Sequence, residues 1–240
     1  MANGQYIALS AAVATSKQLA VVANNLANVN TTGFKQSRTA FEDYLKKSLN
    51  GETPTKGQVV LAETRVDLSH GPVEATGNSL DVALQSEGFM LVQSEQGEHL
   101  TRAGALTVSS DGYLVDLRGN RVMSGTWPNL APIRVPADNR PIQINASGEV
   151  ERDGTVIAKI TVVTTDPKTL TPTGNGLFRA PQETLTQVNQ PSFLSGYLEK
   201  SNVNAIRGMI DLIELNRQYT NSYKLMDKYS KLDSKTMSIV

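Results

Sequence analysis

Cysteine is absent from this sequence of 240 residues. Disulfide bonds, thiolate metal sites and a cysteine nucleophile are therefore excluded. An excess of either charge is also absent, because Lys and Arg together number 23 and Asp and Glu together number 23. Partners that are selected by bulk charge, such as nucleic acid or an anionic membrane surface, are therefore not expected.

Long hydrophobic runs are missing as well. No window approaches the roughly 18 apolar residues that a membrane-spanning helix needs. The N-terminus has none of the basic, apolar and small-residue regions of a secretory signal. We therefore expect neither direct membrane insertion nor a precursor with a signal peptide. A chain of this length can bury a sizeable core, in one large domain or two ordinary ones.

Residues that carry chemistry are sparse. His70 and His99 are the only histidines, and they stand in unrelated contexts without the spacing of a zinc site. Asp111 and Asp153 fall in turn sequences, where turn chemistry accounts for them. We expect no catalytic residue, no cofactor-binding residue, no metal-binding residue and no cofactor.

A helix with a seven-residue repeat is predicted near the N-terminus. Over residues 5–29, small and apolar residues recur at steps of three and four, namely Leu9, Ala12, Ser16, Leu19, Ala23 and Leu26. Between Met1 and Phe34 the only charged residue is Lys17. The pattern predicts a helix that is buried on every side. Because so short a chain cannot wrap this helix completely, we expect other molecules to complete its cover.

Asparagine is unexpected in this helix, because it is about 0.7 kcal/mol less favourable there than alanine. Asn24, Asn25 and Asn28 offer uncharged donors and acceptors, which suits lateral hydrogen bonds to neighbouring chains. Alternatively, they cap a fraying helix end. At the helix exit we expect Gly33 to adopt a positive φ or to approach another backbone closely, and Phe34 to anchor the following connector.

A second helix with heptad spacing is predicted from Asn204 to the C-terminus. Charges such as Arg217 and Asp227 indicate that it has a polar face. Ser201 or Asn202 is expected to cap it, with Asn204 in its first turn. Its predicted seam consists of Ala205, Gly208, Leu212, Leu215, Tyr219, Ser222, Met226 and Tyr229.

Between the two helices the hydrophobic period changes to two, and turn signals become frequent. Hairpins are predicted at Asp111-Gly112, Gly119-Asn120, Ser147-Gly148 and Asp153-Gly154. Strands are also predicted at 80–84, 89–92 and 142–144.

The predicted fold class is α+β, in which the terminal helices pair as a coiled-coil-like domain and a mainly antiparallel β domain is inserted between them. The expected parts are the N-terminal helix (1–33), an extended connector (34–77), the β domain (78–185), a return connector (186–199) and the C-terminal helix (200–240).

Four segments resemble the rod and hook axial proteins of bacterial flagella and occur in that family's order. The short length and the abbreviated segment between Gly125 and Phe178 look more like the proximal-rod member than the longer distal-rod member. Ser79 and Met90 depart from residues that are common in the family. The segments are ANNLANVNTTGFK (23–35), NSLDVALQSEGFMLV (78–92), LTRAGALTVSSDGYLVDLRGNRVMSG (100–125) and GYLEKSNVNAIRGMIDLIELNRQY (196–219).

This resemblance implies a structural subunit of the basal-body rod, which spans the periplasm and transmits torque from motor to hook. The implied partners are other copies of the chain, neighbouring rod proteins and the flagellar type III export apparatus, and no enzymatic activity is implied. A distal-rod member stays an alternative, and a wall-cutting hydrolase of the periplasm with paired carboxylates is a weaker one. We expect axial assembly contacts at Leu19, Ala23, Asn24, Asn25, Leu26, Asn28, Gly33, Phe34, Asn202, Asn204, Leu212, Leu215 and Tyr219.

Overall fold

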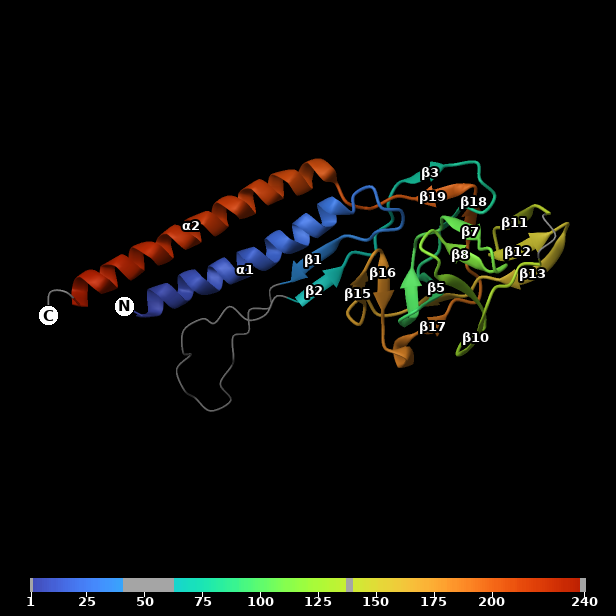
Figure 1. The fold of residues 1–240 in the computed structure, drawn as a ribbon, viewed down its shortest axis with the longest axis horizontal. Helices are drawn as coiled ribbons and strands as arrows, with labels where there is room; N and C mark the ends of the chain where they lie inside the picture. The colour runs from blue at the N-terminus through green and yellow to red at the C-terminus, as the bar shows by residue number, and fades with distance from the viewer. Residues whose placement is uncertain (1, 41–62, 137–139, 238–240) are drawn as a thin grey trace. The chain divides into compact units, whose positions relative to one another are not determined.

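The computed structural model describes residues 2–40, 63–136 and 140–237 (Figure 1). Contacts divide these residues into two compact units. The helical unit holds residues 2–27, 37–40, 63–65 and 204–237, and the β unit holds the other described residues. Both ends of the described chain therefore belong to the helical unit. No helix in the described ranges is long and apolar enough to cross a membrane.

Two long helices make up most of the helical unit. Helix α1 spans Ala2–Ala27, and α2 spans Ala205–Met237. They lie side by side and run in opposite directions, so that α1 begins where α2 ends (Figure 1). Strands β1 (Ser37–Ala40) and β2 (Glu63–Val66) pair with each other, and β1 contacts α1. Together with the β unit, this arrangement confirms the predicted α+β class.

The covered face of α1 differs from the predicted seam. Ala8, Ala12 and Thr15 are buried, whereas Leu9 is 46% exposed and Val13 is 49% exposed. The single chain therefore leaves apolar side chains of α1 uncovered, as we expected for a helix whose cover other molecules complete, and the cover by other molecules stays a prediction. An almost uniformly apolar helix does not reveal which of its faces meets α2, because every face has the composition of an interior one.

The predicted seam of α2 largely matches its covered face. Ala205, Gly208, Leu212, Leu215, Ser222 and Met226 are half-buried, while Tyr219 and Tyr229 are exposed. The predicted cap is wrong, because the N-cap is Asn204, whose Oδ1 accepts a hydrogen bond of 3.0 Å from Arg207 N–H. Ser201 lies too early to cap the helix, and its hydroxyl accepts a hydrogen bond from Val203 N–H instead.

The β unit is built around a ten-stranded antiparallel sheet whose main path is β15–β16–β6–β5–β9–β8–β7. Strand β10 pairs with β9, β14 pairs with β5, and β17 pairs with β14. The strands are β5 (Phe89–Ser94), β6 (Gly97–Thr101), β7 (Leu106–Val108), β8 (Leu114–Asp116), β9 (Arg121–Thr126), β10 (Asn129–Pro132), β14 (Val162–Thr164), β15 (Thr171–Gly174), β16 (Leu177–Arg179) and β17 (Thr186–Gln187), and a short 3₁₀ helix covers Gln182–Thr184.

Three smaller antiparallel sheets complete the β unit. One contains β11 (Ile142–Ile144), β12 (Glu149–Arg152) and β13 (Thr155–Lys159). The other two pair β4 (Val82–Leu84) with β18 (Phe193–Ser195), and β3 (Val73–Ala75) with β19 (Tyr197–Glu199).

Strands β1, β2, β3, β17, β18 and β19 lie in segments that we expected to be connectors, namely 34–77 and 186–199. Each of these strands has only two to four residues. A run that short carries no readable period, and each pairs with a strand far away in the sequence. Residues 41–62 of the first expected connector lie outside the described residues.

All four predicted hairpins are confirmed. The turns that contain Gly112 and Gly119 join β7 to β8 and β8 to β9, and the turn that contains Gly148 joins β11 to β12. Asp153 and Gly154, with φ of 49° and 76°, join β12 to β13. The predicted strands at 89–92 and 142–144 are found in β5 and β11, and the strand at 80–84 is shortened to β4.

Two apolar clusters form the core of the β unit. In the smaller cluster, the rings of Phe89 and Phe178 lie 5.4 Å apart and pack with Leu91, Leu100 and Met123. The larger cluster joins the ten-stranded sheet to the β4–β18 sheet and to the β11–β12–β13 sheet, and it includes Val82, Val92, Val122, Ile144, Val150 and Phe193. Burial of these side chains holds the β unit together.

Candidate functional site

The segment that leads into the β unit and the segment that leads out of it are bonded to each other. Gly33 N–H donates a hydrogen bond of 2.8 Å to the carbonyl of Glu199, and Asn202 N–H donates one of 3.4 Å to the carbonyl of Phe34. The side chain of Phe34 is buried at this junction. Residues 28–36 and 199–203 are therefore fixed together within the β unit.

Gly33 adopts the positive φ that the sequence predicts, at +68°. A Cβ atom at this position would lie 2.4 Å from Ala103 N and 2.4 Å from the carbonyl carbon of Arg102, so the predicted close backbone approach is also present. The expected location is wrong, because α1 already ends at Ala27. Gly33 therefore serves a backbone crossing inside the β unit and does not cap the helix.

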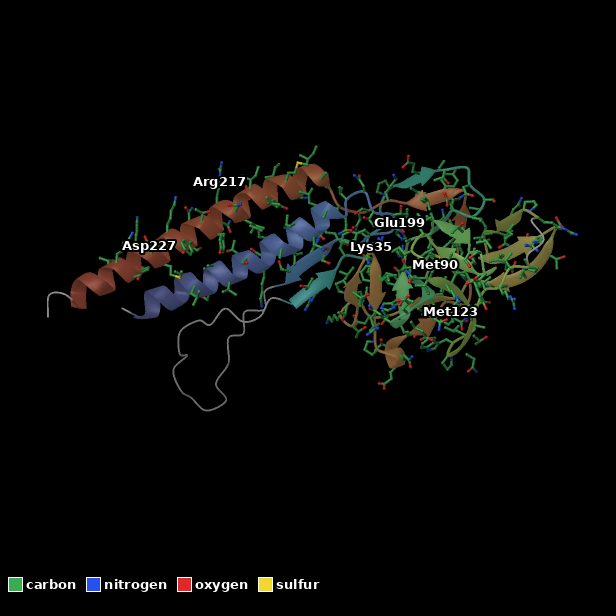
Figure 2. All side chains as sticks on the ribbon, in the orientation of Figure 1. Lys35, Met90, Met123, Glu199, Arg217 and Asp227 are labelled. Carbon is green, nitrogen blue, oxygen red and sulfur yellow. The ribbon has the colours of Figure 1, made fainter. Side chains whose placement is uncertain are left out.

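Three charged side chains are buried together at this crossing, and we call them the ion cluster: Lys35, Arg102 and Glu199. Lys35 Nζ lies 2.6 Å from Glu199 Oε1, and Arg102 Nη1 lies 3.2 Å from Glu199 Oε2. Gly71 N–H donates a further hydrogen bond of 3.0 Å to Glu199 Oε1. Figure 2 shows Lys35 and Glu199 close together. Both cations are paired with the same carboxylate, which offsets part of the cost of removing the charges from water.

The remaining donors of the ion cluster bind backbone carbonyls. Lys35 Nζ donates to the carbonyl of Ser69 at 2.6 Å. Arg102 Nε donates to the carbonyl of Gly88 at 2.9 Å, and its Nη2 donates to the carbonyl of Ser86 at 3.1 Å. The cluster therefore connects five separate segments of the β unit through directed bonds.

Burial and pairing shift the pKa of both partners in the closest pair. Burial lowers the pKa of the Lys35 ammonium, and its hydrogen bond to Glu199 opposes that shift. Burial alone would raise the pKa of the Glu199 carboxyl, but Lys35, Arg102 and the Gly71 N–H together hold it below its usual range. Glu199 is therefore ionised at neutral pH.

Asn202 also bonds within the β unit. Its Oδ1 accepts a hydrogen bond of 2.7 Å from Gln36 N–H, and its Nδ2 donates to the carbonyls of Asp67 at 3.0 Å and Ser69 at 3.1 Å. The Asn202 side chain thus supplies hydrogen-bond partners for backbone groups in two separate segments, one at Gln36 and one at Asp67 and Ser69. A role of Asn202 in assembly stays a prediction beside this observed role.

Asn25 has a similar position in the helical unit. Its Nδ2 donates to the carbonyl of Ser37 at 2.8 Å, and its Oδ1 accepts from Ser37 N–H at 2.9 Å. The side chain is buried and holds β1 against α1. The amide that we expected to bond a neighbouring chain is thus bonded within its own chain.

Replacing Asn25 with alanine should release β1 from α1. The change leaves the N–H and the carbonyl of Ser37 without their partner, which costs about 1–3 kcal/mol. Hydrogen exchange at the amide of Ser37 should accelerate accordingly. Asn30→Ala, at an exposed turn position, is the control and should leave this exchange rate unchanged. Equal rates in Asn25→Ala and the wild type would contradict the assigned role.

The other predicted assembly residues lie on the two helices or close to their ends. Tyr219 is exposed on α2, and Asn204 caps that helix. Asn28 lies just beyond α1, where its Oδ1 accepts a hydrogen bond of 3.2 Å from the hydroxyl of Thr31. Asn24 is exposed on α1. The half-buried members are Leu19, Ala23, Leu26, Leu212 and Leu215. Their role between chains stays a prediction.

Large apolar side chains are exposed along α2. Near its start lie Ile206, Met209, Ile210 and Ile213, which we call the isoleucine patch and which are 52–72% exposed. Their spacing places them on one face of the helix. Further along, Arg217 and Asp227 project from α2 on the side away from α1 (Figure 2). The exposed side of α2 therefore carries the isoleucine patch in its first turns beside charged residues that are exposed as predicted, such as Arg207 and Glu214.

The ion cluster was not predicted from the sequence. Lys35 and Glu199 stand inside the segments that carry the family resemblance, yet we gave neither of them a role. One available signal was that Lys35 follows a long stretch in which Lys17 is the only other charge. Arg102 carried no comparable signal, because a single arginine beside a strand is usually solvated.

Metal and acid–base chemistry gain no support from the described residues. Among them, no group of three or more His, Asp or Glu side chains is placed to hold a metal ion. His70 lies beside Arg102, with Nδ1 3.1 Å from Nη1, and His99 bonds to Ser94 and Gly97 in another part of the β unit.

Three models of flagellar protein families match successive parts of the chain. A model described as flagella basal body rod protein matches residues 6–35. One described as flagellar hook protein FlgE/F/G D1 domain matches residues 83–152, and one described as flagellar basal body rod FlgEFG protein C-terminal matches residues 194–239. The matches therefore include both terminal helices and much of the β unit.

Individual relatives cover nearly the whole chain. The flagellar basal-body rod protein FlgF of Caulobacter vibrioides is 32% identical over 97% of this chain and 95% of its own length. FlgF of Rhizobium meliloti is 31% identical over 97% of this chain and 96% of its own length. The rod protein FlgG of Agrobacterium fabrum is 31% identical over 96% of this chain and 98% of its own length. This chain belongs to the family of flagellar basal-body rod proteins.

Proposed function

We propose that this chain is a structural subunit of the proximal part of the flagellar basal-body rod and that it polymerises through its terminal helices. The observation that carries the proposal is the exposed apolar surface on both helices, in a chain whose relatives are named as rod proteins. Covering an isoleucine side chain completely contributes about 1.5–3 kcal/mol, so contact with a neighbour favours assembly strongly.

Close packing of the terminal helices suits a shaft that carries torque. Densely packed side chains have low compressibility and transmit strain. We propose that α1 and α2 pack in a coiled-coil-like manner, in which small residues allow a close approach. At Gly208, a Cβ atom would lie 3.8 Å from Leu26 Cδ1, which is ordinary contact. Each heterologous contact between subunits would then recur at every step of the polymer.

The proposal includes partners and a location. The partners are further copies of this chain, neighbouring rod proteins and the flagellar type III export apparatus, and the location is the rod where it crosses the periplasm. The proposed role is structural and needs no enzymatic activity. A distal-rod position is a second candidate, because FlgG of Agrobacterium fabrum matches over 96% of the chain, close to the 97% of FlgF from Caulobacter vibrioides.

Ile210→Asp should block assembly of the rod. The substitution places a carboxylate in a face that we propose to be covered by a neighbour, and its desolvation opposes every contact of that kind. Ile210 is 52% exposed, so the stability of the isolated chain should change by only about 0.5 kcal/mol. In a flagellated host that lacks its own FlgF, the variant should give no motility and no complete basal bodies by electron microscopy.

Val156→Asp is the matched control, because Val156 is 50% exposed on β13 in the β unit. It should support motility like the wild type. Normal motility with Ile210→Asp would overturn assembly through this face. Rescue of a host that lacks FlgG, without rescue of one that lacks FlgF, would favour the distal position.

A further inference from the structure

A polar hollow of about 760 Å³ lies in the β unit, away from the ion cluster, where three hairpins come together. Its lining comes from the β5–β6 turn, the β8–β9 turn and the β15–β16 hairpin. Side chains from all three carry hydrogen-bonding groups, among them Ser94, Asn120 and Asn175. The proposed role in the rod assigns nothing to this hollow.

Two arginines give the hollow a positive character. Arg121 lies over the ring of Tyr113, with Cζ 4.2 Å from the ring centroid, which orients its guanidinium. Arg118 extends across to the β15–β16 turn, because a Cβ built on Gly176 would lie 3.9 Å from its Nη1. Glu95 is the one acidic side chain in the lining, so the ionised side chains sum to +1. An arginine pair with planar donors is suited to bind a carboxylate.

The turn that carries Arg118 is held by a buried carboxylate. Asp116 Oδ1 accepts hydrogen bonds from Arg118 N–H at 2.8 Å and from Asn120 N–H at 2.9 Å. Asp116 Oδ2 accepts a third, of 2.7 Å, from Asn120 Nδ2. The loop therefore has a defined backbone conformation before any ligand arrives, which lowers the entropy lost on binding.

His99 adds a ring nitrogen to the same lining. The residue is 2% exposed, and its Nδ1 lies 3.0 Å from Ser94 Oγ and 3.1 Å from the carbonyl oxygen of Gly97. Nδ1 is therefore engaged within the β unit, whereas Nε2 forms no hydrogen bond with any residue in the described part of the chain. A hydroxyl group of a ligand suits Nε2, because a hydroxyl can both donate and accept a hydrogen bond.

We propose that this hollow binds a small carboxylate that also carries hydroxyl groups, such as a sugar acid. The carboxylate would accept from Arg118 and Arg121, and a hydroxyl would form a hydrogen bond with His99 Nε2. A ligand with only one of these groups would leave part of the lining unsatisfied, because the guanidinium groups need an acceptor and His99 Nε2 needs a polar partner. The site is independent of the terminal helices.

Titration of the full chain with D-glucuronate tests this site, with D-glucose and acetate as reference ligands. We expect saturable binding of glucuronate in calorimetry and shifts of the arginine Nε–H signals in NMR. Glucose and acetate should each bind at least tenfold more weakly, because each lacks one of the two recognised groups.

Arg118→Gln should weaken glucuronate binding about tenfold or more, because it removes a charge-assisted hydrogen bond. Arg118 is exposed, so the variant should fold normally. Arg140→Gln is the matched control, since Arg140 is an exposed arginine of the β unit whose Nη1 bonds to Asp153 instead. Its affinity should equal that of the wild type. No saturable binding by the wild type, equal binding of acetate, or equal losses in the two variants would each overturn the proposal.

Discussion

Glu199→Gln should lower the free energy of unfolding of the β unit by about 3–5 kcal/mol, because it leaves buried positive charges without their counter-ion. Lys35 Nζ and Arg102 Nη1 lie 2.6 Å and 3.2 Å from the carboxylate oxygens that the variant neutralises. All three side chains are almost fully buried, so water cannot replace the lost charge. Urea unfolding followed by the fluorescence of Trp127, the only tryptophan, reports on this unit.

Glu74→Gln is the control for this variant. Glu74 Oε2 lies 2.8 Å from Lys200 Nζ, next in sequence to Glu199, but both side chains are well exposed. A solvated ion pair of this kind contributes about 0–1 kcal/mol. Losses of the same size in Glu199→Gln and Glu74→Gln would show that the buried pairing does not stabilise the β unit.

The same carboxylate should make the β unit sensitive to acid. The folded state holds the pKa of Glu199 below its usual range, whereas the unfolded chain has a value of about 4.3. The stabilisation is therefore complete above that unfolded value and is lost as the pH falls through the lower, folded value. The difference in unfolding free energy between wild type and Glu199→Gln should shrink below about pH 4. A difference that stays constant down to pH 2 would contradict this linkage.

Gly33→Ala should be the second large destabilisation. Its new Cβ would lie 2.4 Å from backbone atoms of Arg102 and Ala103. These backbone atoms cannot move away as the end of a flexible side chain can. The positive φ adds about 1–2 kcal/mol for a residue with a Cβ. We expect a total loss above about 3 kcal/mol in the same urea experiment, as in other cases of overpacking and strain.

Gly77→Ala separates the two contributions. Gly77 has a φ of +73°, close to that of Gly33, and a Cβ there would meet nothing within 4 Å. The free energy of unfolding of Gly77→Ala should therefore fall only by the cost of a positive φ, about 1–2 kcal/mol. If Gly33→Ala lowered the free energy of unfolding no more than Gly77→Ala does, the close approach to the backbone at Arg102 would not contribute to the destabilisation.

Local chemistry was sufficient to predict several parts of this protein. The Asp-Gly and Ser-Gly turns identified hairpins because their conformations require residues that tolerate positive φ. The positive φ at Gly33 was predicted for the same reason. Heptad spacing identified both helices and most of the covered face of α2, because its charged residues distinguish an outer face.

Tertiary structure alone decided the rest. The covered face of α1 was not predictable, because a helix that is apolar on all sides gives no directional signal. Lys35, Arg102 and Glu199 lie far apart in the sequence, and only the tertiary fold brings their three segments together. The buried charges are stable there because ion pairs and hydrogen bonds within the cluster replace their lost interactions with water. No single segment contains all of these partners.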